Sequence, residues 1–354
     1  MHLLNANHEI KDNQMNTAYF DMRDLDWRSG CPVRGCTASI WTAPYRRKQM
    51  PYCPVHCIRI HNSKTFVYYN GTSLDSRRTA ALRNIIFERD YFANHILGNA
   101  AKAESHRICH ETSEDALTWN VFSSLAREDL LRGLVSGITG RSLAKESELY
   151  LWGLPVSLDY SSVQRQFPTL EKARKVFEPD IKSWKTEPDI MMYVPGELLL
   201  LVEAKFTSGN TIATENPHGD KTAEKPKSRK GILKRYKSAK LPQGVLLPEA
   251  AASPFYSQLY RNLVFAIYMA EQLGVKWAVA NLVSERLFSQ KRGAAYDDPT
   301  GFVHSVLSEN HHEQFILYSW ERLYADHVQD VPRLFHLASY MRYKSAYCSK
   351  AFEI

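Results

Sequence analysis

The sequence predicts an α/β protein with a mixed central β-sheet flanked by helices, and a small cysteine-rich module near its N-terminus. Three observations lead to this prediction. The run at residues 198–202 is apolar at every position, which is typical of a strand covered on both faces. Segments with apolar residues at helical spacing precede and follow it. Four of the six cysteines lie within the first 57 residues.

Length, charge and cysteine use narrow the class of protein. A chain of 354 residues with 44% hydrophobic residues can bury at least one substantial core. Its formal charge of +7 suits a polyanionic partner without identifying one. The first residues lack a secretory signal, and no segment reaches the ~20 apolar residues that span a bilayer. We therefore expect a cytoplasmic protein without membrane contact, whose cysteines are reduced or metal-bound.

The N-terminal part is expected to contain a tail, a module and a linker. Residues 1–25 are polar and predict a flexible tail, and residues 26–70 form the cysteine-rich module. Residues 71–110 are expected to be a helical linker, because apolar residues recur at helical spacing over 73–103. The main domain is then expected to occupy residues 111–354.

The main domain is expected to begin with a helix near Thr112-Ser113. A hydroxyl side chain there can cap free backbone N–H groups, and Glu114 and Asp115 complement the positive end of the helix. Later comes a predicted hairpin. Its first strand is Ile190–Val194, Pro195-Gly196 supplies the turn, and the apolar run at 198–202 is the second strand.

The rest of the main domain contains a long helix, a strand and two less regular regions. Residues 254–273 predict a helix that ends at Gly274, and Lys276–Val283 predicts another buried strand. Residues 221–240 carry nine Lys or Arg and one Glu, which predicts a basic, partly helical loop. Residues 315–324 and 331–343 fit either two helices or a strand followed by a helix.

The hairpin gathers the residues that indicate chemistry. Pairing about the turn places Asp189 opposite residue 202, next to Glu203. Side chains alternate along a strand, so Glu203 and Lys205 project to the same face. Two carboxylates can bind Mg²⁺ or Mn²⁺ and leave positions for water and a phosphate. Lys205 can orient the attacking water or stabilise charge on the phosphate.

Pro188-Asp189 followed by Glu203-Ala204-Lys205 resembles the motif of the PD-(D/E)XK nuclease superfamily, over roughly residues 110–285. The resemblance implies a restriction-endonuclease-like fold and divalent-metal-dependent cleavage of nucleic acid, more often DNA than RNA. It also implies catalytic roles for Glu114, on a helix before the motif, and for Gln258, on the helix after it. The tyrosine four residues after this glutamine, found in certain exonucleases of the family, is absent.

Each of these residues also has a purely structural interpretation. Asp189 and Glu203 can be ion-pair partners of a lysine or arginine at the ends of two strands. Glu114 can be an acid favoured by the helix dipole, and Gln258 can belong to a polar helix face. Asp180, in a second Glu-Pro-Asp-Ile sequence, is a competing start of the motif.

The cysteine-rich module has the ligand spacing of a structural zinc site. Two pairs of candidate ligands are separated by a loop, which is the usual arrangement of such sites. The favoured set is Cys31, Cys36, Cys53 and His56, with Cys57 as the alternative fourth ligand. A closed shell of four protein ligands argues for a structural zinc ion rather than a catalytic one.

Basic residues near both predicted sites are candidates for contact with nucleic acid. They are Arg46, Arg47, Lys48, Lys227, Arg229, Lys230 and Arg261. The resemblance implies a DNA endonuclease of restriction, phage defence or mobile-element biology, and we expect it to act on double-stranded DNA. Cleavage of both strands would favour a homodimer. The alternatives are a non-catalytic zinc-finger DNA-binding protein and a subunit of a larger nuclease complex.

Overall fold

The computed structural model describes most of the chain, and its contacts divide it into two compact units. The first comprises Met1–Ser124 and Val328–Ile354, and the second Leu125–His327. The described residues are 30–31, 33, 35–45, 48–61, 65–97, 107–157, 167–181, 185–213, 228–236, 241–247, 255–289, 299–347 and 353–354. The predicted tail at 1–25 lies outside them. No helix within these ranges is both long and apolar enough to cross a bilayer.

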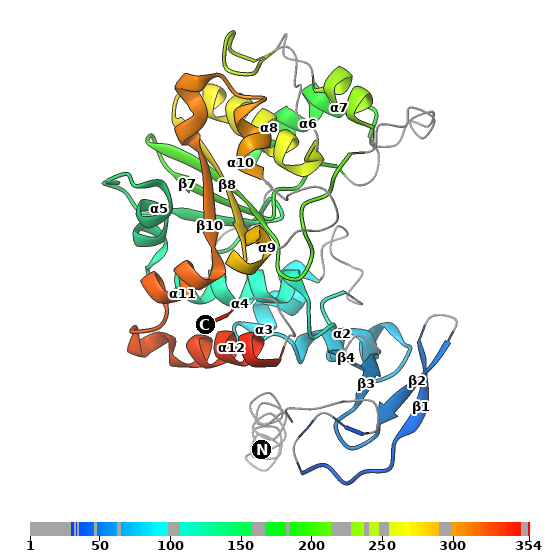
Figure 1. Cartoon of the computed structure of the whole chain (residues 1–354). Coiled ribbons are helices and arrows are strands. Elements are labelled where there is room, and N and C mark those ends of the chain that lie inside the picture. The colour runs from blue at the N-terminus through cyan, green and yellow to red at the C-terminus, as the bar shows by residue number, and fades with distance from the viewer. Residues whose placement is uncertain are drawn as a thin grey trace. The chain divides into compact units, whose positions relative to one another are not determined.

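The second unit is built on a six-stranded mixed sheet with the order β10-β9-β8-β7-β5-β6. Figure 1 labels β7, β8 and β10 of this sheet. The strands are β5 Glu148–Leu151, β6 Leu154–Pro155, β7 Ile190–Val194, β8 Leu198–Ala204, β9 Lys276–Val283 and β10 Phe315–Ser319. β5, β7 and β8 pair antiparallel, whereas β9 and β10 run parallel to β8. The predicted mixed sheet, the hairpin and the strand at β9 are confirmed.

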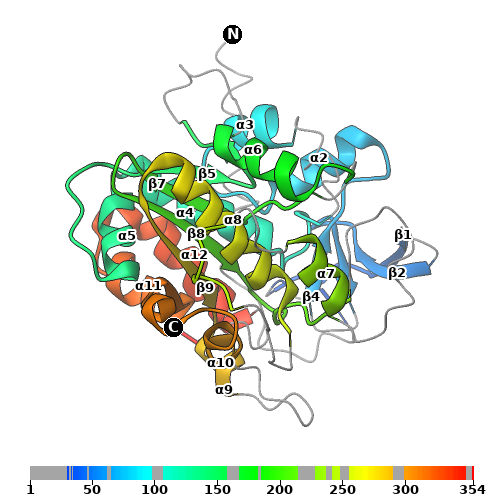
Figure 2. The ribbon, with the colours of Figure 1, turned by 90° about the horizontal axis from the view of Figure 1, so that it is seen from above.

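Helices cover this sheet, as predicted. They are α5 Leu131–Thr139, α6 Pro168–Phe177, α7 Arg229–Arg235, α8 Ser257–Leu273, α9 Glu285–Ser289, α10 Pro299–His304, the 3₁₀-helix η5 Glu309–Gln314 and α11 Trp320–His327. α8 packs along β8 and β9, and α6 packs on α8 (Figure 2). Every residue of β8 is buried, which explains its continuous apolar sequence. α8 ends at Gly274, whose φ of 65° glycine adopts without strain.

The first unit combines an antiparallel sheet with helices, of which α4 and α12 are the longest. The sheet has the order β1-β2-β3-β4, from β1 Trp41–Tyr45, β2 Lys48–Cys53, β3 Ile58–His61 and β4 Thr65–Tyr68. The helices are α2 Leu74–Leu82, α3 Arg89–Tyr91, the π-helix η2 Phe92–Ile96, α4 Glu114–Arg127, the 3₁₀-helix η6 Pro332–Leu334 and α12 Phe335–Tyr347. α4 begins where predicted, and Ser113 Oγ accepts a hydrogen bond from Ala116 N at 3.2 Å.

Two sequence predictions differ from this structure. The helix predicted over 73–103 is interrupted, since α2 ends near residue 82 and Glu88, with a φ of 49°, adopts a left-handed conformation that no helix continues through. The chain also divides elsewhere than at residue 111. Residues from Val328 onward belong with the first unit, where Lys344 lies buried against Glu111 and Asn84. For residues 315–324, the strand-then-helix alternative is the one observed.

Candidate functional site

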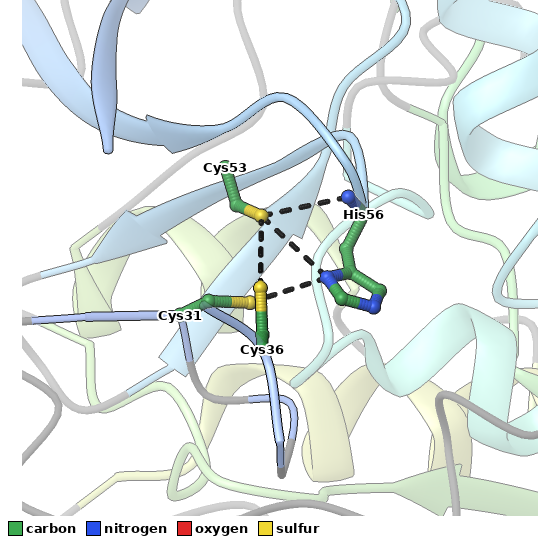
Figure 3. A group of neighbouring side chains, drawn as sticks. All are labelled: Cys31, Cys36, Cys53 and His56. Atoms are coloured by element: carbon green, nitrogen blue, oxygen red, sulfur yellow. Dashed lines mark hydrogen bonds between the residues drawn. The ribbon is translucent and has the colours of Figure 1, made fainter. Parts of the chain in front are cut away.

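Three cysteines and one histidine converge in the first unit (Figure 3). Cys31 and Cys36 flank a short turn, and Cys53 ends β2 and leads into the turn that carries His56. His56 N donates a hydrogen bond to Cys53 Sγ at 3.5 Å. Arg83 holds the same turn from outside, because its guanidinium donates to His56 O at 2.7 Å and to Cys57 O at 2.9 Å.

The spacing of the four ligand atoms fits a tetrahedral ion. His56 Nδ1 lies 3.5 Å from both Cys31 Sγ and Cys53 Sγ, and Cys36 Sγ lies 3.8 Å from Cys53 Sγ. Bonds of about 2.3 Å from zinc to sulfur and about 2.0 Å to nitrogen would place two sulfur atoms about 3.8 Å apart and a sulfur and a nitrogen about 3.5 Å apart. The cluster can therefore bind a metal such as zinc.

Cys57, the alternative fourth ligand, points elsewhere. Its Sγ donates to Pro54 O at 3.5 Å, and it is not a member of the cluster. Its φ of 49° turns the chain immediately after His56. The structure thus brings His56 Nδ1 to the three sulfur atoms and leaves out Cys57.

Burial shifts the pKa values of Cys31, Cys53 and His56. It raises the pKa of the Cys31 and Cys53 thiols above the usual range, because a thiolate loses solvation in the interior. Burial also lowers the pKa of His56, and the positive charge of Arg83 adds to this effect. A neutral imidazole is the form that binds zinc, whereas the thiols must each lose a proton.

The predicted acidic residues meet at the end of the β7–β8 hairpin. Ile190 lies opposite Val202 in this antiparallel pair. Asp189 directly precedes Ile190 and Glu203 directly follows Val202, so the two acidic residues lie at the same end of the hairpin. Lys205 Nζ lies 2.6 Å from Glu203 Oε1 and 3.9 Å from Asp189 Oδ2. We call Asp189, Glu203 and Lys205 the Asp-Glu-Lys triad.

The triad is held by backbone as well as by charge. Asp189 Oδ2 accepts a hydrogen bond from Ala204 N at 3.0 Å, which fixes the aspartate against the second strand. Lys205 N donates to Leu282 O at 2.8 Å, and Lys205 O accepts from Trp320 Nε1 at 2.8 Å. The lysine backbone is therefore clamped between β9 and the start of α11.

Two asparagines missed as site residues lie beside Glu203. Asn262, on α8, donates from Nδ2 to Glu203 Oε2 at 2.8 Å. Asn281 lies opposite Glu203 on the parallel strand β9 and is fully buried, and its amide N and O have no hydrogen-bond partner among the described residues. Asn262 could have been found from its helical position four residues after Gln258. Asn281 sits in an apolar strand and gives no comparable signal.

The three side chains of the triad differ in their exposure to solvent. Glu203 and Lys205 have side chains only 3% and 6% exposed, whereas the Asp189 side chain is 19% exposed. Burying two carboxylates is costly unless positive charge compensates them, and here the lysine ammonium does so. A ligand would therefore approach the triad from the side of Asp189.

Gln258 and Glu114 are the two helix residues to which the resemblance assigns catalytic roles. Gln258 Oε1 accepts a hydrogen bond from Thr211 Oγ1 at 2.8 Å, so the glutamine ties the first turn of α8 to the loop after β8. Glu114 opens α4 and belongs to the first unit, whereas the triad belongs to the second.

Arg261 lies among acidic groups inside the second unit. Burial lowers its pKa, and the charges of Tyr236, Glu178 and Glu203 oppose that shift. Its Nε is buried without a hydrogen-bond partner among the described residues. Arg261 as a whole is partly exposed, so only part of its side chain is enclosed by the protein.

The competing motif at Asp180 has a different environment. Asp180 is an exposed partner of Arg235, with 3.2 Å between Arg235 Nη2 and its Oδ2. The preceding Glu178 is buried, and its carboxylate accepts from Thr186 N at 2.7 Å, from Thr186 Oγ1 and from the Tyr236 hydroxyl. Within the described part of the chain, neither residue shares a lysine with a second carboxylate, as Asp189 and Glu203 share Lys205.

Only some of the residues predicted to contact nucleic acid are among the described residues. Lys48 is exposed at the start of β2. Arg229 and Lys230 open α7, so the basic loop contains a helix, and the Arg229 guanidinium carbon lies 5.9 Å from the centre of the Phe255 ring. Arg46, Arg47 and Lys227 lie outside the described residues.

Comparison of the chain with protein-family models, with curated proteins and with solved structures finds no match.

Proposed function

We propose that this protein is a metal-dependent nuclease whose catalytic centre is the Asp-Glu-Lys triad. The observation that supports this best is the convergence of Asp189, Glu203 and Lys205 within ion-pair distance at the end of a buried hairpin. Two carboxylates and one ammonium are the groups that hydrolysis of a phosphodiester with a hard cation requires.

The residues present fit an Mg²⁺ or Mn²⁺ ion on chemical grounds. Asp189 and Glu203 supply two carboxylates, and oxygen is the preferred ligand atom of these cations. Asn281, buried beside Glu203 without a hydrogen-bond partner among the described residues, offers an amide to a water molecule of the ion. The bound cation would acidify a water molecule and polarise the phosphate.

The remaining residues position these groups. Asn262 donates to Glu203 and orients its carboxylate, and the Ala204 N–H does the same for Asp189. Lys205 is the movable positive charge. It neutralises the carboxylates in the metal-free protein and can turn to the attacking water or the phosphate once a cation takes its place.

The order of the elements also supports the proposal. The triad lies on a mixed sheet with helices packed on it, and α8 crosses from β8 to the parallel strand β9. This arrangement is what the resemblance to the PD-(D/E)XK superfamily implies for the strands that carry the motif.

We take double-stranded DNA as the substrate, cut endonucleolytically in restriction, phage defence or mobile-element biology. The net charge of +7 favours a polyanion. A zinc ion bound by the Cys/His cluster of the first unit would stabilise a module that positions the substrate. A homodimer would allow both strands to be cut.

A cleavage assay tests the proposal. The zinc-loaded protein is incubated with supercoiled plasmid, linear duplex, single-stranded DNA and RNA, each with Mg²⁺, with Mn²⁺ or without either. Asp189→Asn and Lys205→Met are assayed beside Asp180→Asn, which changes an exposed carboxylate elsewhere in the same unit. We expect cleavage that needs the cation, is lost in the first two variants and persists in the third.

One observation favours a second candidate, a non-catalytic DNA-binding protein. Lys205 Nζ already lies 2.6 Å from Glu203 Oε1, so the carboxylates are compensated without a metal. Duplex binding without cleavage of any substrate under either cation would support this candidate. Cleavage that appears only with a second protein added would indicate a subunit of a larger nuclease.

A further inference from the structure

The first unit contains a cavity of about 380 Å³ that none of the sites above uses. It lies where β4 pairs with the segment after residue 107, through Tyr68 N donating to Cys109 O at 2.9 Å. The volume lies within the range of about 300–1,000 Å³ that small-molecule sites occupy. The lining residues that matter here are Arg59, Tyr68, Tyr69, Arg77, Cys109 and His110.

The charge of the lining favours an anion. Two arginines and one histidine line the cavity, and no aspartate or glutamate among the residues that the structure describes lines it. Arg77 projects from the first turns of α2 and is exposed, so its guanidinium is available at the rim. The N-terminal end of α2, next to the lining residue Thr72, adds partial positive charge.

The walls also present flat, fixed surfaces. The guanidinium carbon of Arg59 lies 3.3 Å from the centre of the Tyr69 ring, and that of Arg83 lies 4.4 Å from the Tyr68 ring. Tyr69 is supported from behind by Tyr52, with ring centres 5.6 Å apart. A planar ring can stack on an arginine or tyrosine held in this way.

One further wall of the cavity is apolar at neutral pH. Burial raises the pKa of the Cys109 thiol to about 12, so the group stays uncharged and offers a small, weakly polar surface. Pro44 and Val67 add apolar surface to the same lining. Basic groups, flat rings and apolar walls thus occur together in one cavity.

We propose that this cavity binds a single nucleotide, with its base against the Arg59–Tyr69 stack and its phosphate near Arg77 and His110. The nucleotide is either free or one residue unstacked from a nucleic-acid strand. The inference rests on the proposed function only in taking nucleic acid as a source of the ligand. It concerns binding in the first unit and requires no cleavage.

Calorimetric titration of the full-length, zinc-loaded protein without added Mg²⁺ tests the inference. The probes are the four deoxynucleoside monophosphates, the matching nucleosides, inorganic phosphate and a short single-stranded oligonucleotide. Arg77→Gln removes a charge at the rim, and Arg78→Gln is the matched control, because Arg78 is exposed on the same helix but does not line the cavity. Zinc content is measured for each protein.

We expect nucleotide binding that Arg77→Gln weakens about tenfold or more, as the loss of a charge-assisted contact predicts, and that Arg78→Gln changes about twofold or less. Mononucleotides that bind as tightly as the oligonucleotide identify a free ligand. Binding of the oligonucleotide alone identifies a nucleotide within a strand. The absence of any binding, equal losses in both variants, or phosphate that binds as tightly as a nucleotide would overturn the inference. Because cleavage is not measured, a failure here leaves the proposed nuclease centre standing.

Discussion

His56 and Cys57 are neighbours in the chain, yet only His56 turns its ligand atom toward the other three. The sequence could not decide between them, because both fit the spacing after Cys53. The decision comes from the backbone of the turn, in which Cys57 adopts a φ of 49° and its thiol donates to Pro54 O. The choice of ligand is therefore a property of the turn rather than of the residue type.

This geometry predicts opposite results for two serine substitutions. Cys53→Ser should abolish the binding of about one zinc ion per chain, because a hydroxyl is a poor zinc ligand. Cys57→Ser should retain the ion, because its sulfur is not one of the four ligand atoms. Zinc content measured by atomic emission after dialysis checks both. Loss of zinc from Cys57→Ser together with retention by Cys53→Ser would disprove the assigned ligand set.

Asn281 provides a test of function against stability. A buried amide without a hydrogen-bond partner among the described residues destabilises the fold. Asn281→Leu should therefore raise the free energy of unfolding by about 1 kcal/mol. If Asn281 bonds to the metal-bound water, the same variant should also lose cleavage activity by about tenfold or more. Urea denaturation and the cleavage rate are measured on the same protein. A variant that is more stable and equally active would remove Asn281 from the site.

The β7–β8 hairpin shows what local sequence can specify. Its two strands, its turn and the meeting of Asp189 with Glu203 all follow from a short contiguous stretch, in which alternation and pairing determine positions. The segment at 73–103 shows where this reasoning stops. Apolar periodicity continued past residue 82, but the left-handed backbone at Glu88 leaves no mark in that periodicity.

The C-terminal helix α12 could not be assigned to the first unit from sequence either. Lys344 is buried, and its ammonium donates to Glu111 O, to Glu111 Oε1 at 3.2 Å and to Asn84 Oδ1 at 3.5 Å. Its partners are more than 200 residues earlier in the chain. A lysine in an otherwise ordinary helix gives no sign of such a long-range ion pair.

Removal of this lysine should destabilise the first unit. Lys344→Met removes the positive partner of the buried Glu111 carboxylate, which predicts a loss of about 3–5 kcal/mol. Lys344→Met combined with Glu111→Gln should recover part of the loss, because both charges of the buried ion pair are then removed. Denaturant unfolding of the two variants and of the wild type measures these differences. Equal stability of Lys344→Met and the wild type would show that the ion pair does not anchor α12.

At the scale of the whole molecule, the chain forms two units whose boundary the sequence did not reveal. The predicted main domain began at residue 111, but its last segment, from Val328, joins the first unit. The mixed sheet and its flanking helices were predictable, because strands with buried faces and helices of sufficient length are visible locally. The return of the C-terminal segment depends on packing between distant segments, which no local pattern records.

This organisation predicts that removal of zinc affects the units differently. Metal binding by the cluster of Cys31, Cys36, Cys53 and His56 would stabilise the surrounding fold, so a chelator should then expose β1–β4 to proteolysis. The core of the second unit, which surrounds β8, should stay protected. Limited proteolysis with mass spectrometry, before and after chelation, follows both. Simultaneous digestion of both units would indicate that they unfold together.

The central claim is that Asp189 and Glu203 bind a divalent cation, and a measurement of Mn²⁺ binding tests it without knowledge of the substrate. Electron paramagnetic resonance counts the Mn²⁺ bound by the zinc-loaded wild type, by Asp189→Asn and by Asp180→Asn. We expect about one Mn²⁺ per chain for the wild type and for Asp180→Asn, and its loss in Asp189→Asn. Equal Mn²⁺ binding by Asp189→Asn and the wild type, or no binding by the wild type, would contradict it and leave the triad as an internal ion pair.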